Sequence, residues 1–162
     1  MADNGDNKIH IIGIGDDGIE GLSSGARTLL SEAELVVGTP PTLALAATPD
    51  AEQVVLKGDL DEAVERLSQA QDQRVVVLAL GDPLFFGTAR FLFDRLGKDR
   101  FKVVPHVSTM QLAFARVKES WDEAYLTNLA TTPHGKMLDR MRTAQKVGLF
   151  TTEEWPPAKV AG

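Results

Sequence analysis

Short apolar runs alternate with amphipathic stretches along this chain, and this alternation restricts the fold more than any other feature. The strongest run, "RVVVLAL" at 74–80, is continuously hydrophobic. That character is typical of a central parallel strand buried on both faces. The stretch 59–71 instead places its apolar residues on one side of a helix. The chain therefore follows the strand–helix order of an α/β protein.

The same reasoning predicts the elements of a complete sheet. Strands are expected at 8–14, 34–38, 53–57, 74–80 and 101–105. Helices are expected at 21–33, 59–71, 87–97 and 108–117. Strands that alternate with helices in this way build an open parallel α/β sheet with helices on both faces.

The pattern changes near residue 118, where a charged stretch precedes a new strand–helix–strand unit. The new strands are expected at 123–130 and 146–152, with a helix at 135–145 between them. One such unit cannot bury both faces of its own sheet. We therefore expect a flexible tail over 1–7, an N-terminal α/β domain over 8–118, and an incomplete second α/β domain over 119–162.

Composition excludes several classes of protein. The chain is 43% hydrophobic and 25% charged, as in ordinary globular proteins. It lacks the roughly 18 consecutive apolar residues of a membrane-spanning helix. It contains no cysteine and three scattered histidines, so no metal site is expected. A net charge of −6 disfavours nucleic acid as a partner. A cytoplasmic protein acting on small molecules is the expectation.

The first apolar run ends in "GIGDDG" at 13–18, which has the G-x-G-x-x-G spacing of dinucleotide-binding loops. Such a site also needs an acidic residue at the end of the second strand, where this chain has Gly38 and Thr39. Asp16 and Asp17 would moreover face the pyrophosphate with like charge. The alternative is a tight β–α turn that needs glycine for its backbone angles.

Two further loops follow predicted strands. "GDPLFFG" at 81–87 combines glycine, a carboxylate and aromatic rings. It suits a polar–apolar ligand such as a nucleoside, because ligands of open sheets collect beyond the carboxyl ends of strands. Asp82 and Pro83 are equally explained by turn chemistry. "PHVST" at 105–109 offers Ser108 and Thr109, either of which would also cap the following helix.

These three motifs, in this order and spacing, resemble those of the tetrapyrrole (corrin/porphyrin) methylase family. The family motifs are G-x-G-P-G-D, G-D-P and P-G-[IV]-[ST]-[SA]. Within that family the chain is most similar to the C5-methylating domain of precorrin-6Y C5,15-methyltransferases, through "VVVLALGDPLFFGTA", "STMQLAFARVKESWDEA" and "HGK". Two departures stand out: Asp16-Asp17-Gly18 replaces Pro-Gly-Asp, and His106 replaces the glycine of the third motif.

The resemblance implies a fold of two α/β domains that binds S-adenosyl-L-methionine and a precorrin. It assigns the cofactor to Leu80, Gly81, Asp82, Phe85, Ser108 and Thr109. It assigns the substrate to Gly15, Asp16, Asp17 and His134. The catalytic residue stays unassigned, with Asp17, His106 and His134 as the available general bases.

The activity implied is methylation of C5 of a precorrin in cobalamin biosynthesis. The resemblance also implies a homodimer, and a separate or fused partner for C15 methylation and decarboxylation. Three alternatives stay open. The first is methylation of uroporphyrinogen, protein or RNA by a member of the same superfamily. The second is an NAD(P)-dependent oxidoreductase, and the third is a non-catalytic remnant that binds only the donor or a partner.

Overall fold

A computed structural model describes residues 8–48, 50–57 and 60–161, so the expected tail over 1–7 lies outside the described residues. The chain forms two compact units, one up to Ser108 and the other from Thr109 onward. Helix α5 (Thr109–Val117) therefore groups with the second unit. The domains expected over 8–118 and 119–162 stay a prediction, because compact grouping does not show which segments fold independently.

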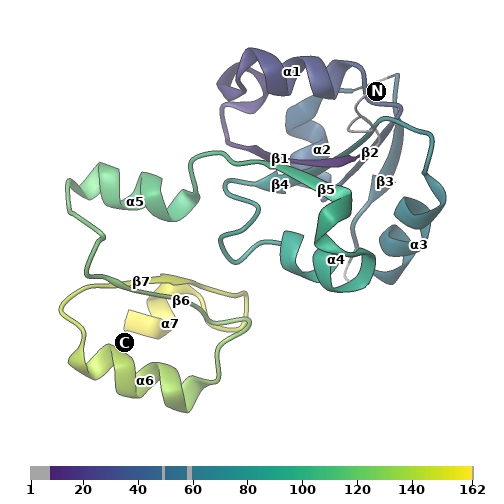
Figure 1. Ribbon diagram of the computed structural model, residues 1–162. Coiled ribbons are helices and arrows are strands. Elements are labelled where there is room, and N and C mark those ends of the chain that lie inside the picture. Colours follow the sequence, from purple (N-terminus) through teal and green to yellow (C-terminus); the bar gives the residue numbers. More distant parts are fainter. Residues whose placement is uncertain (1–7, 49, 58–59, 162) are drawn as a thin grey trace. The chain divides into compact units, whose positions relative to one another are not determined.

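The first unit contains a five-stranded, fully parallel sheet (Figure 1). Its strands are β1 (Ile9–Ile14), β2 (Leu35–Gly38), β3 (Glu52–Val55), β4 (Val75–Leu80) and β5 (Phe101–Val104). Their order is β3-β2-β4-β1-β5, and Ile12 of β1 pairs with Leu78 of β4 and Val104 of β5. The predicted open parallel sheet is confirmed.

Helices cover both faces of this sheet. The helices are α1 (Ser24–Ser31), α2 (Pro40–Ala46), α3 (Asp61–Gln69) and α4 (Ala89–Leu96). Buried residues of α1 and α2 share one core cluster, and those of α3 and α4 share the other. Strand–helix–strand crossovers are right-handed, so the direction in which the chain moves along the sheet decides which face each helix covers. The connections through α1 and α2 run toward β3, and those through α3 and α4 run back toward β5.

The two cores explain why the central strands are apolar at every position. Successive side chains of a strand point to opposite faces of the sheet. In β4, Val77 belongs to the core beneath α3 and α4, whereas Leu78 belongs to the core beneath α1 and α2. Ile11 and Ile12 of β1 divide in the same way.

Helix α2 was not predicted, because Pro40 and Pro41 after β2 were interpreted as the end of a strand and nothing more. Proline is well accommodated in the first turn of a helix, where backbone N–H groups have no intrahelical partner. The following Thr42, Leu43 and Ala46 are buried and attach α2 to the sheet. Two short 3₁₀ helices, η1 (Gly18–Gly21) and η2 (Lys98–Arg100), were also not predicted.

The second unit contains a two-stranded parallel sheet with three helices. Its further elements are β6 (Tyr125–Asn128), α6 (His134–Thr143), β7 (Val147–Phe150) and α7 (Pro157–Ala161). Tyr125 pairs with Val147, and α6 connects the two strands. The predicted strand–helix–strand order is therefore correct, whereas α7 was not predicted.

Candidate functional site

The topology of the first sheet indicates where a ligand would bind. β1 and β4 are neighbours. The chain leaves β1 toward α1 on one face, and it leaves β4 toward α4 on the other. Ligands of open α/β sheets bind outside the carboxyl ends of such a strand pair. This location brings together the β1–α1 loop (residues 15–23) and the β4–α4 loop (residues 81–88).

The start of the β4–α4 loop packs backbone to backbone against the end of β1. The N–H of Gly81 donates a 2.9 Å hydrogen bond to the carbonyl of Ile14, and Gly81 has a φ of +67°. A Cβ at Gly13 would overlap the carbonyl oxygen of Gly81 and would lie 2.7 Å from the backbone nitrogen of His106. Gly13 is therefore required by the close approach of Gly81 and His106 to β1.

This geometry departs from a dinucleotide site. Gly18 leads into η1, and α1 begins only at Ser24, so the third glycine does not open the helix that follows β1. β1 lies between β4 and β5, whereas the dinucleotide-binding sheet has β1 beside β2. β2 ends at Gly38, which packs against Thr42. The glycine spacing thus serves turn geometry and packing.

The β4–α4 loop is a tightly wound and strained segment. The Asp82 carboxylate accepts a 2.9 Å hydrogen bond from the N–H of Leu84, and the Asp82 carbonyl accepts one of 3.1 Å from Phe85. Phe86 has a φ of +54°, which is rare for any residue other than glycine. A Cβ at Gly87 would overlap the Pro83 carbonyl. Strained backbone of this kind clusters at ligand-binding sites.

Apolar side chains are exposed around Asp82. Leu80, Leu84 and Phe86 are 55%, 61% and 42% exposed, all at the carboxyl end of β4. Phe85 is half-buried and meets Phe86 edge to face at 4.8 Å between ring centroids. An exposed apolar patch on a folded surface often marks a binding site. Here it surrounds one carboxylate, an arrangement suited to a flat ring with polar edges.

The predicted site residues divide between the two units. The described residues up to Ser108 include Gly15, Asp16, Asp17, Leu80, Gly81, Asp82, Phe85 and Ser108. Gly15, Gly81 and Ser108 are buried, whereas Asp16 and Asp17 are exposed. Thr109 and His134 begin α5 and α6 of the second unit, where the His134 ring contacts that of Trp155 at 5.4 Å between centroids. The assignment of all these residues to the site stays a prediction.

Sequence reasoning missed Leu84, and it did not distinguish Phe86 from Phe85. Both Phe86 and Leu84 are exposed at the candidate site. The orientation of Phe86 follows from its left-handed backbone, for which the letters "LFFG" carry no signal. The glycine that follows and the Asx turn of Asp82 are the only local hints of so tight a loop.

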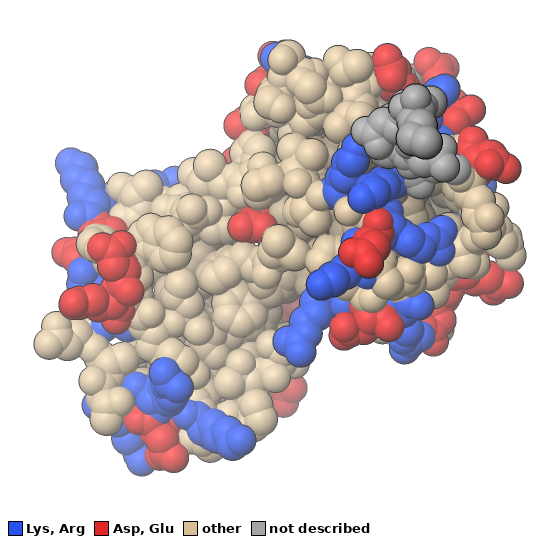
Figure 2. All heavy atoms as spheres, viewed as in Figure 1, with Lys and Arg blue, Asp and Glu red and all other residues tan. Residues whose placement is uncertain are grey.

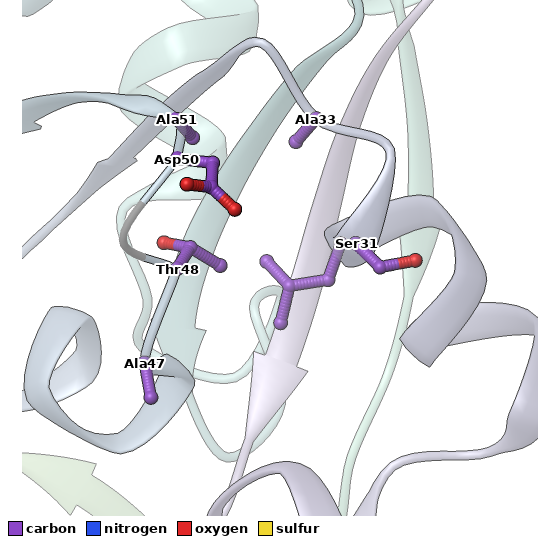
Figure 3. Close-up of a pocket in the computed structure, with 7 residues that line it drawn as sticks. Ser31, Ala33, Ala47, Thr48, Asp50 and Ala51 are labelled. Atoms are coloured by element: carbon purple, nitrogen blue, oxygen red, sulfur yellow. The ribbon is translucent and has the colours of Figure 1, made fainter.

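A cavity of about 190 Å³ lies elsewhere in the first unit (Figure 3). Its lining residues are Leu30, Ser31, Ala33, Ala47, Thr48, Asp50 and Ala51. Ala33 and Ala51 precede strands β2 and β3, so the cavity is at the amino ends of strands, opposite the candidate site. The Thr48 hydroxyl is buried there without a hydrogen-bond partner among the described residues. None of these lining residues belongs to the β1–α1 loop or the β4–α4 loop.

Two carboxylates have lowered pKa values, and neither belongs to the β1–α1 or the β4–α4 loop. Hydrogen bonding to Arg66 lowers the pKa of Glu52, and hydrogen bonding to Lys146 lowers the pKa of Glu119.

On the face shown in Figure 2, positive and negative side chains are interspersed, and broad areas carry neither. Among the described residues, no cluster of three or more His, Cys, Asp or Glu side chains suits a metal ion. No helix in the described ranges is long and apolar enough to span a bilayer.

Together, the parallel sheet and its two helical layers define an α/β protein, and the loops at the carboxyl ends of β1 and β4 form its candidate ligand site. More particularly, the chain belongs to the Tetrapyrrole (Corrin/Porphyrin) Methylases, the family that matches residues 8–152. The sequence resemblance is thereby confirmed.

Two relatives define the match further. The chain is 35% identical over 135 residues to a precorrin-6Y C(5,15)-methyltransferase [decarboxylating] of Sinorhizobium, covering 82% of this chain and 31% of that protein. It is 29% identical over 140 residues to a probable cobalt-precorrin-7 C(5)-methyltransferase of Methanocaldococcus jannaschii, covering 83% and 64%. The chain thus spans about a third of one relative and less than two thirds of the other.

Solved structures agree on the fold. The precorrin-6Y methylase of Archaeoglobus fulgidus matches with a TM-score of 0.65 and 25% identity, covering 76% of this chain and 65% of that one. A uroporphyrin-III C-methyl transferase of Thermus thermophilus, complexed with S-adenyl homocysteine, matches with a TM-score of 0.56 and 24% identity, covering 75% and 55%.

Proposed function

We propose that this chain takes part in S-adenosylmethionine-dependent methylation of C5 of a precorrin in cobalamin biosynthesis. The observation that carries the proposal is the convergence of the β1–α1 and β4–α4 loops at the carboxyl ends of β1 and β4. Family membership, and two relatives named as C5-methyltransferases of precorrins, supply the reaction and the substrate class.

The residues around Asp82 fit the methyl donor. The exposed Leu80, Leu84 and Phe86 offer apolar surface for the faces of an adenine ring. Asp82 and the backbone of Gly81 offer polar atoms for its edges and for the ribose. The structure of the Thermus relative with S-adenyl homocysteine supports a donor of this class. On the family resemblance we assign Leu80, Gly81, Asp82, Phe85, Ser108 and Thr109 to the donor. On their exposure beside Asp82 we add Leu84 and Phe86.

The donor supplies a methyl group already activated on a sulfonium. The work left to the protein is therefore alignment of the ring carbon with that methyl group and exclusion of water. The β4–α4 loop is suited to alignment, because the Asx turn of Asp82 and the packing of Gly87 against Pro83 hold its shape. The apolar side chains beside it are suited to exclude water.

The exposed carboxylates of the β1–α1 loop suit the substrate. Ionised Asp16 and Asp17 only accept hydrogen bonds, and pyrrole N–H groups of a macrocycle only donate them. A loop that presents two acceptors beside the donor site would therefore orient the ring plane. We assign Gly15, Asp16, Asp17 and His134 to the substrate on this ground and on the family resemblance.

We further propose that the chain acts as a homodimer, and that C15 methylation and decarboxylation belong to a separate or fused partner. The support for the first is that β6 and β7, the strands described in the second sheet, each have an open edge. The support for the second is the name and greater length of the Sinorhizobium relative. Light scattering at two protein concentrations tests the dimer, and a single species of monomer mass would contradict it.

Calorimetry tests the donor assignment. S-adenosylhomocysteine should bind saturably, and NADH should not. Transfer of a ¹³C-methyl group from the donor to C5 of an added precorrin, followed by NMR, tests the reaction itself. Saturable NADH binding without any binding of S-adenosylhomocysteine would overturn the proposal, as would a methyl group found only at another ring position.

A further inference from the structure

His106 lies beside the candidate site, at the position where the family motif has glycine. It follows Pro105 in the β5–α5 loop (residues 105–108), and its side chain is 16% exposed. Its imidazole Nε2 is 3.3 Å from the carbonyl oxygen of Gly21 and 3.8 Å from a carboxylate oxygen of Asp17. Both of these partners belong to the β1–α1 loop, 85 or more residues earlier in the chain.

Both ring nitrogens of His106 face backbone carbonyls: Nε2 is 3.3 Å from that of Gly21, and Nδ1 is 3.4 Å from that of the neighbouring Val107. Carbonyl and carboxylate oxygens only accept hydrogen bonds, so a ring nitrogen can bond to them only by donating. A hydrogen on Nε2 bonds the ring to Gly21, and this bond joins the β5–α5 loop to the carboxyl end of the β1–α1 loop. The contact with Val107 is local to the β5–α5 loop.

Packing reinforces this hydrogen bond. A Cβ placed on Gly15 would lie 2.8 Å from Cε1 of His106 and 2.6 Å from the Asp17 carboxylate. A Cβ on Gly21 would overlap the same carboxylate. The imidazole and the Asp17 carboxylate thus fill the space that side chains at 15 and 21 would otherwise occupy.

We propose that His106 is a positioning residue that holds the β1–α1 loop, and with it Asp17, against the carboxyl end of β1. This inference rests on the proposed function, because it gives the loop its role beside the donor site. It adds a residue that acts through Asp17 and Gly21 and touches neither donor nor macrocycle. In a relative with glycine at this position, the loop would have to be held by other contacts.

Hydrogen exchange on three forms of the chain tests the proposal: wild type, His106→Ala and His106→Gln. In His106→Ala, the amides of residues 15–21 should exchange about tenfold faster. In His106→Gln they should stay within about twofold of wild type, because the amide N–H₂ can still donate to the Gly21 carbonyl. The amides of α3 serve as the internal reference for global stability.

Unchanged exchange of residues 15–21 in His106→Ala would overturn the proposal. Equal loss in the Ala and Gln variants, with α3 still protected, would overturn it as well, because it would show that the donated hydrogen bond holds nothing. If His106→Ala fails to fold, the comparison of His106→Gln with His106→Leu carries the test. Faster exchange in the leucine variant alone supports the role, and equal exchange in both overturns it.

Calorimetry with S-adenosylhomocysteine separates this inference from the proposed function. Its affinity should fall about tenfold in His106→Ala and change less than twofold in His106→Gln. If wild type binds no S-adenosylhomocysteine, the proposed function fails, while the exchange experiment still decides whether His106 holds the loop. If wild type binds and both variants bind equally well, the role of His106 at the donor site is overturned.

Discussion

The two compact units are built from the same strand–helix–strand connection, yet they bury very different amounts of apolar surface. In the first, helices on both faces sandwich five strands around two cores. In the second, the described sheet has two strands. Among the described buried apolar residues, only Met110, Leu129 and Met137 belong to it. Because a two-stranded sheet can bury little apolar surface, we expect the first unit to be the more stable of the two.

This comparison also bears on the candidate site. The strained β4–α4 loop is anchored on β4, whose residues from Val75 to Ala79 are buried. Strain at Phe86 persists only where the surrounding structure determines it strongly. The first unit can therefore hold a left-handed phenylalanine in the β4–α4 loop.

The largest expected effect is a difference in stability between the two units. Both tryptophans, Trp121 and Trp155, belong to the second unit. In a urea titration, tryptophan fluorescence should therefore change at lower urea than far-UV circular dichroism, which reports mainly the first unit. Leu67→Ala, at a fully buried position, should cost the first unit about 2–5 kcal/mol and move only the dichroism transition. Coincident transitions that shift together would show that the chain unfolds as one cooperative body.

Glycine-to-alanine substitutions add one carbon atom and so compare how tightly the two units are packed at the substituted positions. Gly13→Ala should destabilise the first unit by about 1–3 kcal/mol or more, because the new Cβ meets backbone atoms of Gly81 and His106 that cannot move aside. Gly148→Ala should cost less, since its nearest neighbours are the flexible ends of Met110, Leu126 and Phe114.

Gly25→Ala is the matched control for these two variants. This position lies inside α1 with nothing within 4 Å of a new Cβ. Gly25 is the second residue of α1, so alanine there should stabilise by less than the roughly 0.5–1 kcal/mol that it contributes in mid-helix. Thermal denaturation of the three variants gives the ranking. A smaller loss for Gly13→Ala than for Gly148→Ala would contradict the tighter packing of the first unit.

Substitutions at Asp82 distinguish a role in the turn from a role in ligand binding. Asp82→Asn keeps a side-chain oxygen that can accept from the Leu84 N–H, whereas Asp82→Ala removes it. If Asp82 also contacts the donor, Asp82→Ala should weaken S-adenosylhomocysteine binding by about 0.5–1.5 kcal/mol. Calorimetry measures this loss, and melting temperature controls for the fold. A lower melting temperature with unchanged affinity would mean that Asp82 serves the turn alone.

The smallest expected effect is the response to acid. Arg66 lowers the pKa of Glu52 in the first unit, and Lys146 lowers the pKa of Glu119 in the second. A lowered folded-state pKa stabilises above the ordinary glutamate pKa of about 4.3, and this contribution is lost as pH falls through the lowered value. Glu52→Gln and Glu119→Gln should each slightly flatten the acid limb of stability for their own unit. An unchanged acid limb in both would show that these exposed pairs contribute nothing.

Much of the fold was predictable from residue patterns, because strand and helix periodicity are local properties of the chain. The predicted strands at 8–14, 74–80 and 101–105 contain β1, β4 and β5. Helix α2 was the clear failure, since its two prolines are also strong turn signals. The three candidate site loops could be placed together from the sequence, because each follows a strand in a parallel sheet and such loops lie at one edge. Their role in binding stays a prediction.

The sequence by itself determined the alternation of elements, the parallel sheet and the three motifs, since these depend on neighbouring residues. Only the tertiary structure decided the strand order that places β1 beside β4, because the choice of crossover is not written in local periodicity. It likewise decided that position 13 has no room for a side chain beside the Gly81 carbonyl. It also decided that the Phe86 side chain is exposed and that the His106 ring contacts the Gly21 carbonyl. Each of these depends on atoms brought together from distant parts of the chain, where packing and hydrogen bonding select one arrangement.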